Sequence, residues 1–390
     1  MTQSTMAIPA KRLFWAFLRL GATAFGGPAA VAYIQILAVK KNHWLTKEEF
    51  QDGAALCQSI PGATAIQTAA YVGLRAGGPL GALAAFVGFG LPAFVLMAAL
   101  SAAYVASRDL GPVLAAFRGL NVIVIAIIVN AAIRFGRGSI KNWRDAVVAA
   151  GAMVFLLFRG NPMIAIAGAA SIGLVLHQND NNPEAGRFSP QQTHIHRMLL
   201  WPTAFALLVF ASLAVIFFAD RKLFALATVM LKVDIFAFGG GFASVPLMLH
   251  EVVDVRHWMD GKIFMDGIAL GQVTPGPIVI TATFVGYHIA GLMGAVVGTL
   301  AVFSPSFFMV LTIAPFLDRL RESALFRRAL RGVLASFVGL LAAVAFHFGM
   351  TIPWSIPATF MAVSAFVALY LKADILWVVL AGASIAVFAL

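Results

Sequence analysis

Long apolar stretches alternate with short polar connections along almost the whole chain. Most reach the roughly 20 apolar residues that a helix needs to cross a bilayer, so they predict membrane helices. Six stretches precede one polar segment, a seventh follows it, and six more complete the chain. Their approximate ranges are 11–39, 50–75, 79–106, 111–134, 144–158, 161–177, then 198–219, then 222–249, 263–288, 292–317, 323–349, 352–371 and 373–390.

The second set of six stretches repeats the first. Phe25-Gly26-Gly27 returns as Phe238-Gly239-Gly240, 213 positions later (239 − 26). Pro61-Gly62 returns as Pro275-Gly276 at an offset of 214 (276 − 62), and the register then goes back to 213 as far as Phe135-Gly136 and Phe348-Gly349. A register kept over this length indicates two homologous halves.

The repeats predict an all-α, polytopic integral membrane protein of about 13 membrane segments. We expect an N-terminal repeat over 1–177, a polar linker with a connecting membrane helix over 178–221, and a C-terminal repeat over 222–390. Six segments per repeat plus the extra one make the halves enter the membrane from opposite sides, which is an inverted repeat. If the Pro-Gly segments are re-entrant, the crossings fall to about 11 and the inversion is kept.

The distribution of Lys and Arg predicts the orientation, because these residues accumulate on the cytoplasmic side. With a cytoplasmic N-terminus, the loop around 134–144 is cytoplasmic and basic, whereas its repeat counterpart around 349–353 has no Lys or Arg. The basic loop around 319–328 is cytoplasmic as well. Lys40, Lys41 and Lys47 disagree, because they would lie outside, although Glu48 and Glu49 partly offset their charge.

Composition narrows the function classes. Of 390 residues, 61% are hydrophobic and 11% charged, and the net charge is +11. The basic residues are scattered at helix ends, which favours a role in topology and no nucleic-acid partner. The single Cys57 excludes a disulfide framework or a multi-cysteine metal site. We expect no metal and no cofactor, since His194-x-His196 in the polar linker is a weak signal.

Two paired interruptions of the apolar stretches are the candidate substrate site. Broken helices inside a membrane are tolerated where the backbone is packed or lines a wet cavity, and half-helix N-termini can bind an anion. The alternative is that the glycines only permit close helix packing, or that each proline is a plain kink. The candidate residues are Phe25, Gly26, Gly27, Gln58, Pro61 and Gly62 in the first half and Phe238, Gly239, Gly240, Gln272, Pro275 and Gly276 in the second.

Cations within apolar stretches are further candidates, because a charge at bilayer depth is costly and is expected to face a cavity or a partner. Arg19 and Lys232 each lie six residues before the Phe of Phe-Gly-Gly and are candidates for attracting an anion. The alternatives are snorkelling and, for Lys232, pairing with Asp234. The weaker candidates, for which topology or packing is the stronger explanation, are Arg75, Arg118, His288 and Arg331.

Asp52 and Asp266 are repeat-matched carboxylates six residues before Gln58 and Gln272. Carboxylates within membrane segments can bind and release protons along a transport pathway. Equally, each is placed where an acidic residue stabilises a helix N-terminus beside Trp44 or Trp258.

Together these motifs resemble the chromate ion transporter family, in its long form with two fused halves. The first half matches a basic residue, Phe-Gly-Gly-Pro, an Asp and a Gln-x-x-Pro-Gly stretch, and the second half matches the same series. Gly241 and Ala63 depart from the family pattern, which has proline at both positions, so the halves are not interchangeable. The resemblance covers nearly the whole chain except the linker.

The resemblance implies export of chromate across the cell inner membrane, with chromate resistance as the result and sulfate as a close mimic. Proton- or sulfate-linked exchange is implied as well. A sulfate or other oxyanion importer or channel on the same fold is the main alternative. An enzyme is not expected, because no Asp-x-x-x-Asp or His-Glu-x-x-His motif is present. A homodimer through Gly78 and Gly81 is one arrangement that the sequence allows.

Overall fold

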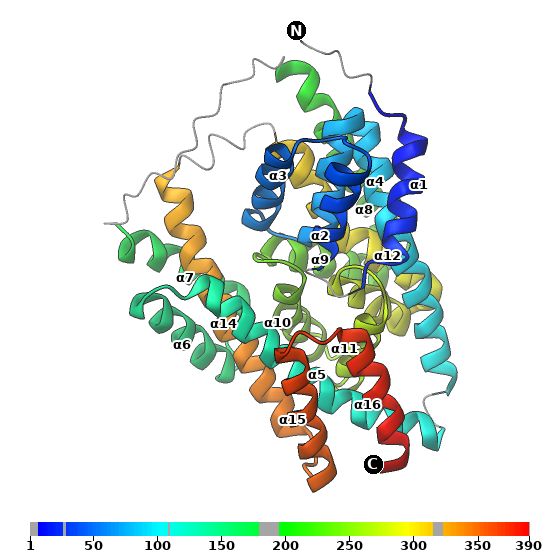
Figure 1. Ribbon diagram of the computed structural model, residues 1–390, viewed down its shortest axis with the longest axis vertical. Coiled ribbons are helices and arrows are strands. Elements are labelled where there is room, and N and C mark those ends of the chain that lie inside the picture. The colour runs from blue at the N-terminus through cyan, green and yellow to red at the C-terminus, as the bar shows by residue number, and fades with distance from the viewer. Residues whose placement is uncertain (1–6, 26–28, 108–109, 179–194, 315–322, 390) are drawn as a thin grey trace.

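The computed structural model describes residues 7–25, 29–107, 110–178, 195–314 and 323–389. These residues form helices joined by short connections, and they contain no strand. Figure 1 shows α1 (Ala10–Gly21) and α16 (Ile375–Ala389), the first and last described helices, towards opposite ends of a helical bundle. The expected all-α fold is therefore confirmed.

The described residues of the first half form seven helices and one π-helical turn. They are α1 (Ala10–Gly21), α2 (Ala29–Gln35), η1 (Ile36–Lys41), α3 (Lys47–Ser59), α4 (Thr64–Ser107), α5 (Gly111–Ser139), α6 (Trp143–Leu157) and α7 (Pro162–Leu176). The connecting helix α8 (Ile195–Ala219) follows the linker.

The second half repeats this series and contains two additional short 3-10 turns, η2 and η4. It contains α9 (Arg221–Phe236), η2 (Gly241–Ala243), α10 (Ser244–Leu249), η3 (His250–Val255), α11 (Gly261–Val273), η4 (Ile278–Ile280), α12 (Thr281–Ile313), α14 (Ala324–Thr351), α15 (Ile356–Tyr370) and α16 (Ile375–Ala389). Even the irregularities match: η1 and η3 are both π-helical, and His43 and His257 both have a positive φ.

Side-chain caps define many helix starts. Thr46 and Glu49 form a capping box at α3, and Asn142 and Asp145 form another at α6. In the second half, the Asp260 side chain caps α11 by accepting from the Ile263 N–H, without the second hydrogen bond of a capping box. A cap satisfies N–H groups that the first helical turn leaves without a partner, so these polar residues fix where the apolar helices begin.

Helix α4 folds back on itself at Gly77 and Gly78, where φ of Gly78 is +67°. A Cβ added at Gly73 would overlap the carbonyl oxygen of Gly81, although eight residues of straight helix span about 12 Å. α12 reverses in the same way at Ala290 and Gly291. Each is therefore a pair of antiparallel arms, as the separate apolar stretches predicted. Because Gly81 packs within the chain, it is not free to form the homodimer face considered above.

The Pro-Gly segments also double back. Gly53 of α3 packs against the ring of Tyr71 in the first arm of α4, and Gly267 of α11 packs in the same way on Phe284 of α12. Each pair is a helical hairpin with Pro-Gly at its tip. Its first arm, α3 or α11, has 13 residues, which is too short to cross a bilayer. Such a hairpin is the shape that the re-entrant alternative predicts.

The Phe-Gly-Gly segments differ from the expected single interrupted crossing. In the second half, α10 and η3 return along α9, so that Lys232 of α9 reaches Glu251 of η3. In the first half, the ring of Trp44, after η1, stacks on Phe17 of α1 with centroids 6.2 Å apart. The interrupted stretches 11–39 and 222–249 are therefore hairpins, because the chain that follows each glycine-rich break returns along the helix that precedes it.

The remaining helices surround these hairpins. α1 packs on α4, α9 packs on α12, and α14 packs against α5, α6 and α7 (Figure 1). Five helices of the described residues are long and apolar enough to cross a membrane: α4, α5, α8, α12 and α14. α8 exposes large apolar side chains, with Phe218 83% exposed, which is typical of a surface facing lipid.

Candidate functional site

Each Pro-Gly turn contacts the opposite half of the chain beside its Phe-Gly-Gly segment. The first Pro-Gly turn (Pro61-Gly62) contacts the end of α9, where the Gly62 N–H donates to the Ala237 carbonyl at 2.8 Å. The second Pro-Gly turn (Pro275-Gly276) contacts the end of α1, where the Gly276 N–H donates to the Ala24 carbonyl at 3.0 Å. Each half thus binds the Phe-Gly-Gly break of the other through equivalent atoms.

Glycine is required at both Pro-Gly turns. Gly62 has φ +114° and Gly276 has φ +102°, a region that residues with a Cβ rarely adopt. Gly62 is the more enclosed of the two: a Cβ there would lie 2.6 Å from the Gln67 side-chain nitrogen and 3.2 Å from the Asp234 carboxylate. At Gly276 the nearest atom would be the Ala93 Cβ at 3.1 Å.

Helix N-termini begin at these tips. α4 starts at Thr64, directly after the first Pro-Gly turn, and η4 and α12 start after the second. A helix N-terminus carries free N–H donors and partial positive charge, so it favours an anion. The second break also lies against this region, since a Cβ at Gly240 would be 3.3 Å from the Thr64 hydroxyl. Pro61 and Pro275 are buried, Phe238 and Gly239 are half-buried, and Phe25 ends the described segment. Gly26 and Gly27 lie outside the described residues.

The two repeat-matched glutamines have different environments. Gln58 is exposed at the end of α3, whereas Gln272 is 9% exposed at the end of α11. The Gln272 side-chain nitrogen is buried and has no hydrogen-bond partner within the described parts of the chain. A buried donor without a partner costs about 1–3 kcal/mol, which a bound acceptor would relieve. Gln272 is therefore the stronger candidate for contacting an oxyanion.

The two candidate cations differ as well. Arg19 is exposed in the last turn of α1. Lys232 donates to Glu251 at 2.5 Å, and its side chain is 44% exposed whereas that of Glu251 is 5% exposed. The alternative pairing of Lys232 with Asp234 is wrong, because its partner is Glu251. Any attraction of an anion by the exposed Arg19 would therefore be long-range and screened by salt, while much of the charge of Lys232 is offset locally.

The two candidate carboxylates are likewise unequal. Asp52 is half-buried on α3. Asp266 is 4% exposed on α11 and accepts a 2.7 Å hydrogen bond from the hydroxyl of Tyr104, which belongs to the first half. Asp266 therefore joins the two halves, and its burial inside the helical bundle matches a proton-exchanging group better than that of Asp52.

Three of the weaker cation candidates have partners or surroundings away from the tips. Arg75 is exposed and pairs with Glu49 at 3.2 Å, and His288 stacks on Phe284. Arg118 is exposed on α5. Nothing in these contacts brings the three residues to the Pro-Gly turns.

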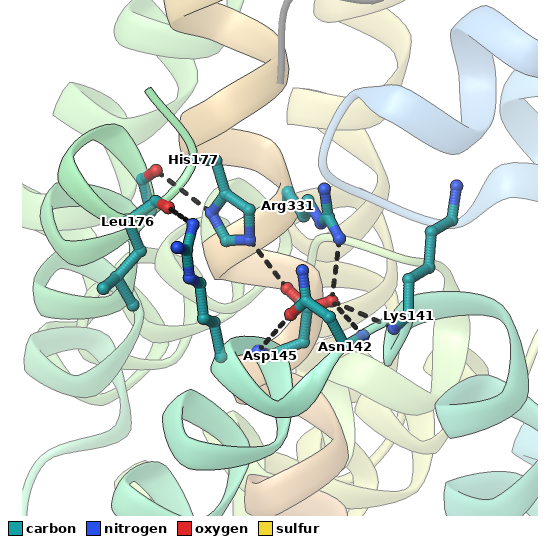
Figure 2. Close-up of polar contacts among 8 residues, drawn as sticks. Lys141, Asn142, Asp145, Leu176, His177 and Arg331 are labelled. Carbon is teal, nitrogen blue, oxygen red and sulfur yellow. Dashed lines mark hydrogen bonds and ion pairs between the residues drawn. The ribbon is translucent and has the colours of Figure 1, made fainter. Parts of the chain in front are cut away.

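Arg331 belongs to a separate polar cluster (Figure 2). Its guanidinium donates to Asp145 at 3.1 Å, and Asp145, fully buried, also accepts from the backbone N–H of Lys141 and contacts the His177 ring nitrogen at 2.9 Å. Arg144 donates to the Leu176 carbonyl at 2.7 Å. This cluster joins the ends of α6 and α7 to α14, so it anchors helices outside the central hairpins.

Sequence reasoning passed over Asp234 as a site residue. It lies in the last turn of α9, fully buried, and accepts from the N–H and the hydroxyl of Ser306 at 2.8 and 2.7 Å. A usable signal was present, because Asp234 occupies the repeat position of Gly21 at the offset of 213 (234 − 21). An ionisable residue in one repeat only marks a place where the halves differ.

Comparison with known proteins decides the family. The family model described as chromate transporter matches residues 11–174 and again 224–387. The chain belongs to the chromate transporter family. The match to each half confirms the two repeats, and together with the apolar helices it makes the chain a multi-pass membrane protein.

Several relatives of this chromate transporter family member span most of its length. An uncharacterized transporter of Methanocaldococcus jannaschii is 40% identical over 95% of this chain and 92% of its own. A chromate transport protein of Pseudomonas aeruginosa is 32% identical over 92% and 85%, and one of Cupriavidus metallidurans is 31% identical over 85% and 80%. No solved structure matches the chain.

Proposed function

We propose that this protein carries chromate, a tetrahedral oxo-dianion, out of the cytoplasm and thereby confers chromate resistance. The observation that supports this most is the contact of each Pro-Gly turn with the opposite half, beside its Phe-Gly-Gly segment, in a chain of this family. The tips combine the N-termini of α4 and α12 with the buried side-chain nitrogen of Gln272, which lacks an acceptor. A tetrahedral oxyanion is recognised by such N–H donors.

The membrane potential favours this direction. Moving two negative charges out of a cell held at ~100 mV negative inside releases about 4.6 kcal/mol, from roughly 2.3 kcal/mol per charge. Export therefore needs no coupling in principle. We include proton- or sulfate-linked exchange in the proposal, with Asp266 and Asp52 as the first candidate proton carriers.

The orientation that we propose has the N-terminus in the cytoplasm and the protein in the cell inner membrane. Two contacts join the basic end of α5 to the end of α15: Arg134 donates to the Leu369 carbonyl, and Arg137 donates to the Tyr370 hydroxyl. A third joins the basic start of α14 to the end of α7, where Arg328 donates to the Gln178 carbonyl. Basic residues gathered at these helix ends favour that side as cytoplasmic.

The hairpin geometry also removes the disagreement over Lys40, Lys41 and Lys47. If α1 and α2, and likewise α3 and the first arm of α4, enter and leave on one side, these lysines lie on the side of the N-terminus. The Ile8 N–H donates to the Ala76 carbonyl at 2.9 Å, so the start of α1 lies beside the last residues of the first arm of α4. The proposed orientation therefore accounts for these lysines as well.

The experiment is chromate loading of inside-out membrane vesicles, with excess sulfate as competitor. We expect loading by the intact protein and a loss of more than about tenfold in Gln272→Ala, since one hydrogen bond to a charged ligand is worth about 1.5–3 kcal/mol. The matched Gln58→Ala should lose much less. Arg19→Ala should slow loading most at low ionic strength, where exposed charges act over the longest range, and Lys232→Ala should slow it less.

Two outcomes would overturn parts of the proposal. Vesicles that load no chromate above an empty-membrane control would reject chromate as the substrate. Equal losses in Gln272→Ala and Gln58→Ala would reject the assignment of the site. An importer or channel of sulfate or another oxyanion on the same fold is distinguished by the direction of accumulation and by the absence of counterflow.

A further inference from the structure

The carboxyl group of Asp234 is buried without a cationic partner. Its side chain is 0% exposed, and no Lys, Arg or His nitrogen in the described parts of the chain lies within 4.0 Å of it. It also lies in the last turn of α9, where the partial negative charge of the helix end opposes a carboxylate. Burying an unpaired charge is costly, so this position favours the protonated form.

The hydrogen bonds of Asp234 leave room for one proton. Both of its donors, the N–H and hydroxyl of Ser306, go to one oxygen, Oδ2. The other oxygen, Oδ1, is buried and has no hydrogen-bond partner among the described residues. The Gln67 oxygen Oε1 is a second buried acceptor without a partner in that part of the chain, and both side chains border Gly62. A proton on Oδ1 would turn this acceptor without a partner into a donor.

This carboxyl group also touches the junction of the halves. The hydroxyl of Ser306 accepts from the Ala63 N–H at 3.1 Å while it donates to Asp234. The neighbouring Gly62 N–H donates to Ala237, three residues after Asp234. The protonation state of Asp234 therefore bears on the same hydrogen bonds that hold the first Pro-Gly turn against the second Phe-Gly-Gly break.

The groups around Asp234 do not compete for that proton. Ser306 comes from α12, and Gly62 and Gln67 come from the first Pro-Gly turn and α4; none of these is titratable. On α9 itself, Lys232 is bound to Glu251 of η3, beyond which His250 faces Asp254. The titratable groups of α12, Tyr287 and His288, lie on the other arm of that helix, before its reversal at Ala290 and Gly291.

We propose that Asp234 is a proton-binding site of the second half, and that it gains a proton from one side of the membrane and loses it to the other during each transport cycle. The first half has no such group, because Gly21 and Ala93 stand at the repeat positions of Asp234 and Ser306. This inference rests on the proposed transport function. It assigns proton coupling to one half and leaves the equivalent place in the other half as a packing contact.

Infrared difference spectroscopy tests the protonation directly, without any transport. The purified intact protein is titrated with acid and base, and the carbonyl stretch of a protonated carboxyl group is followed. We expect a titrating band that is absent in Asp234→Asn, present in Asp266→Asn, and shifted in Ser306→Ala, which removes one hydrogen bond to the group. If wild type and Asp234→Asn have the same bands, the proposal is overturned.

Vesicle transport tests the coupling. Chromate loading of wild-type vesicles should change severalfold when a pH gradient is imposed, whereas Asp234→Asn should load at a rate that the gradient does not change. A pH-gradient response that survives in Asp234→Asn would overturn the coupling role, as would a response that depends on sodium instead of protons. Wild-type vesicles that load no oxyanion would reject the transport proposal, while the infrared band would still decide whether Asp234 binds a proton.

Discussion

The contact between α1 and α4 in the first half and the equivalent contact between α9 and α12 in the second half are formed by different side chains. In the first half, Gly21 lies so close to the Phe89 carbonyl that any Cβ would overlap it. In the second half the same position is Asp234, and it bonds to Ser306 instead. One backbone scaffold thus holds an inert contact in one copy and an ionisable group in the other. Duplication provided the geometry, and a few substitutions separated the roles.

The largest effect is expected from replacing the glycine of each Pro-Gly turn with alanine, which adds one methyl group at equivalent positions of the two halves. Gly62→Ala should be the most damaging substitution, because its φ of +114° strains any other residue by about 1–3 kcal/mol and its Cβ would overlap the Ser306 hydroxyl. Gly276→Ala suffers the same kind of strain but meets only Ala93. We expect Gly62→Ala to lose folded protein and transport, and Gly276→Ala to retain part of both.

Thermal unfolding in detergent and vesicle loading would measure the difference. Gly138→Ala serves as the control, because its helical position has open space around the added Cβ. Equal damage at Gly62 and Gly276 would show that the two turns are equivalent, and the proposed asymmetry between the halves would be wrong.

The second test concerns the cluster around Asp145, which the second half lacks because Ala358 stands at that position. Asp145→Ala leaves Arg331 and His177 without their shared carboxylate and should reduce the free energy of unfolding by about 3 kcal/mol. Denaturant or thermal unfolding measures it. Arg331→Ala should cost less, since Arg331 is 23% exposed. The reverse order would contradict the view that Asp145 is the centre of the cluster.

A smaller effect is expected for the hydroxyl pair that joins the two arms of α12. Thr283 and Thr299 are buried and hydrogen-bonded, whereas Ala70 and Phe86 occupy these positions in α4. Thr283→Val should lower the free energy of unfolding by about 1 kcal/mol, because Thr299 keeps its bond to the Ala295 carbonyl. A loss well above that in unfolding experiments would mean that the hydroxyl pair also holds the hairpin closed.

The smallest effect is expected at the exposed pair Arg75 and Glu49, which the second half replaces with His288 and Ile263. The two side chains are 43% and 42% exposed, so Arg75→Gln should change the free energy of unfolding by less than about 1 kcal/mol, and added salt should remove the difference. Unfolding at low and high salt measures both. A large loss of chromate loading in this variant would make Arg75 a substrate-binding residue after all.

The sequence alone determined the all-α repeat and the position of every paired break. Apolar periodicity, glycine and proline are local signals, and duplication makes each visible twice, so the repeat register is enough to identify Gly62 and Gly276 as equivalent. It also limited the candidate charges to a few residues, because charges inside apolar stretches are costly and rare.

Only the tertiary structure decided what these breaks do. An apolar stretch does not reveal whether the chain crosses the membrane or turns back to the side it entered from. The stretch 11–39 is therefore predicted to be one crossing, whereas the structure shows a hairpin. Nor does repeat alignment reveal partners: Lys232 binds Glu251, and Asp234 lies enclosed beside Ser306. Burial and hydrogen bonding depend on segments far apart in the chain, as the bond from Ala63 to Ser306 shows. Local sequence sets where the backbone breaks, and long-range packing sets which side chains the broken ends enclose.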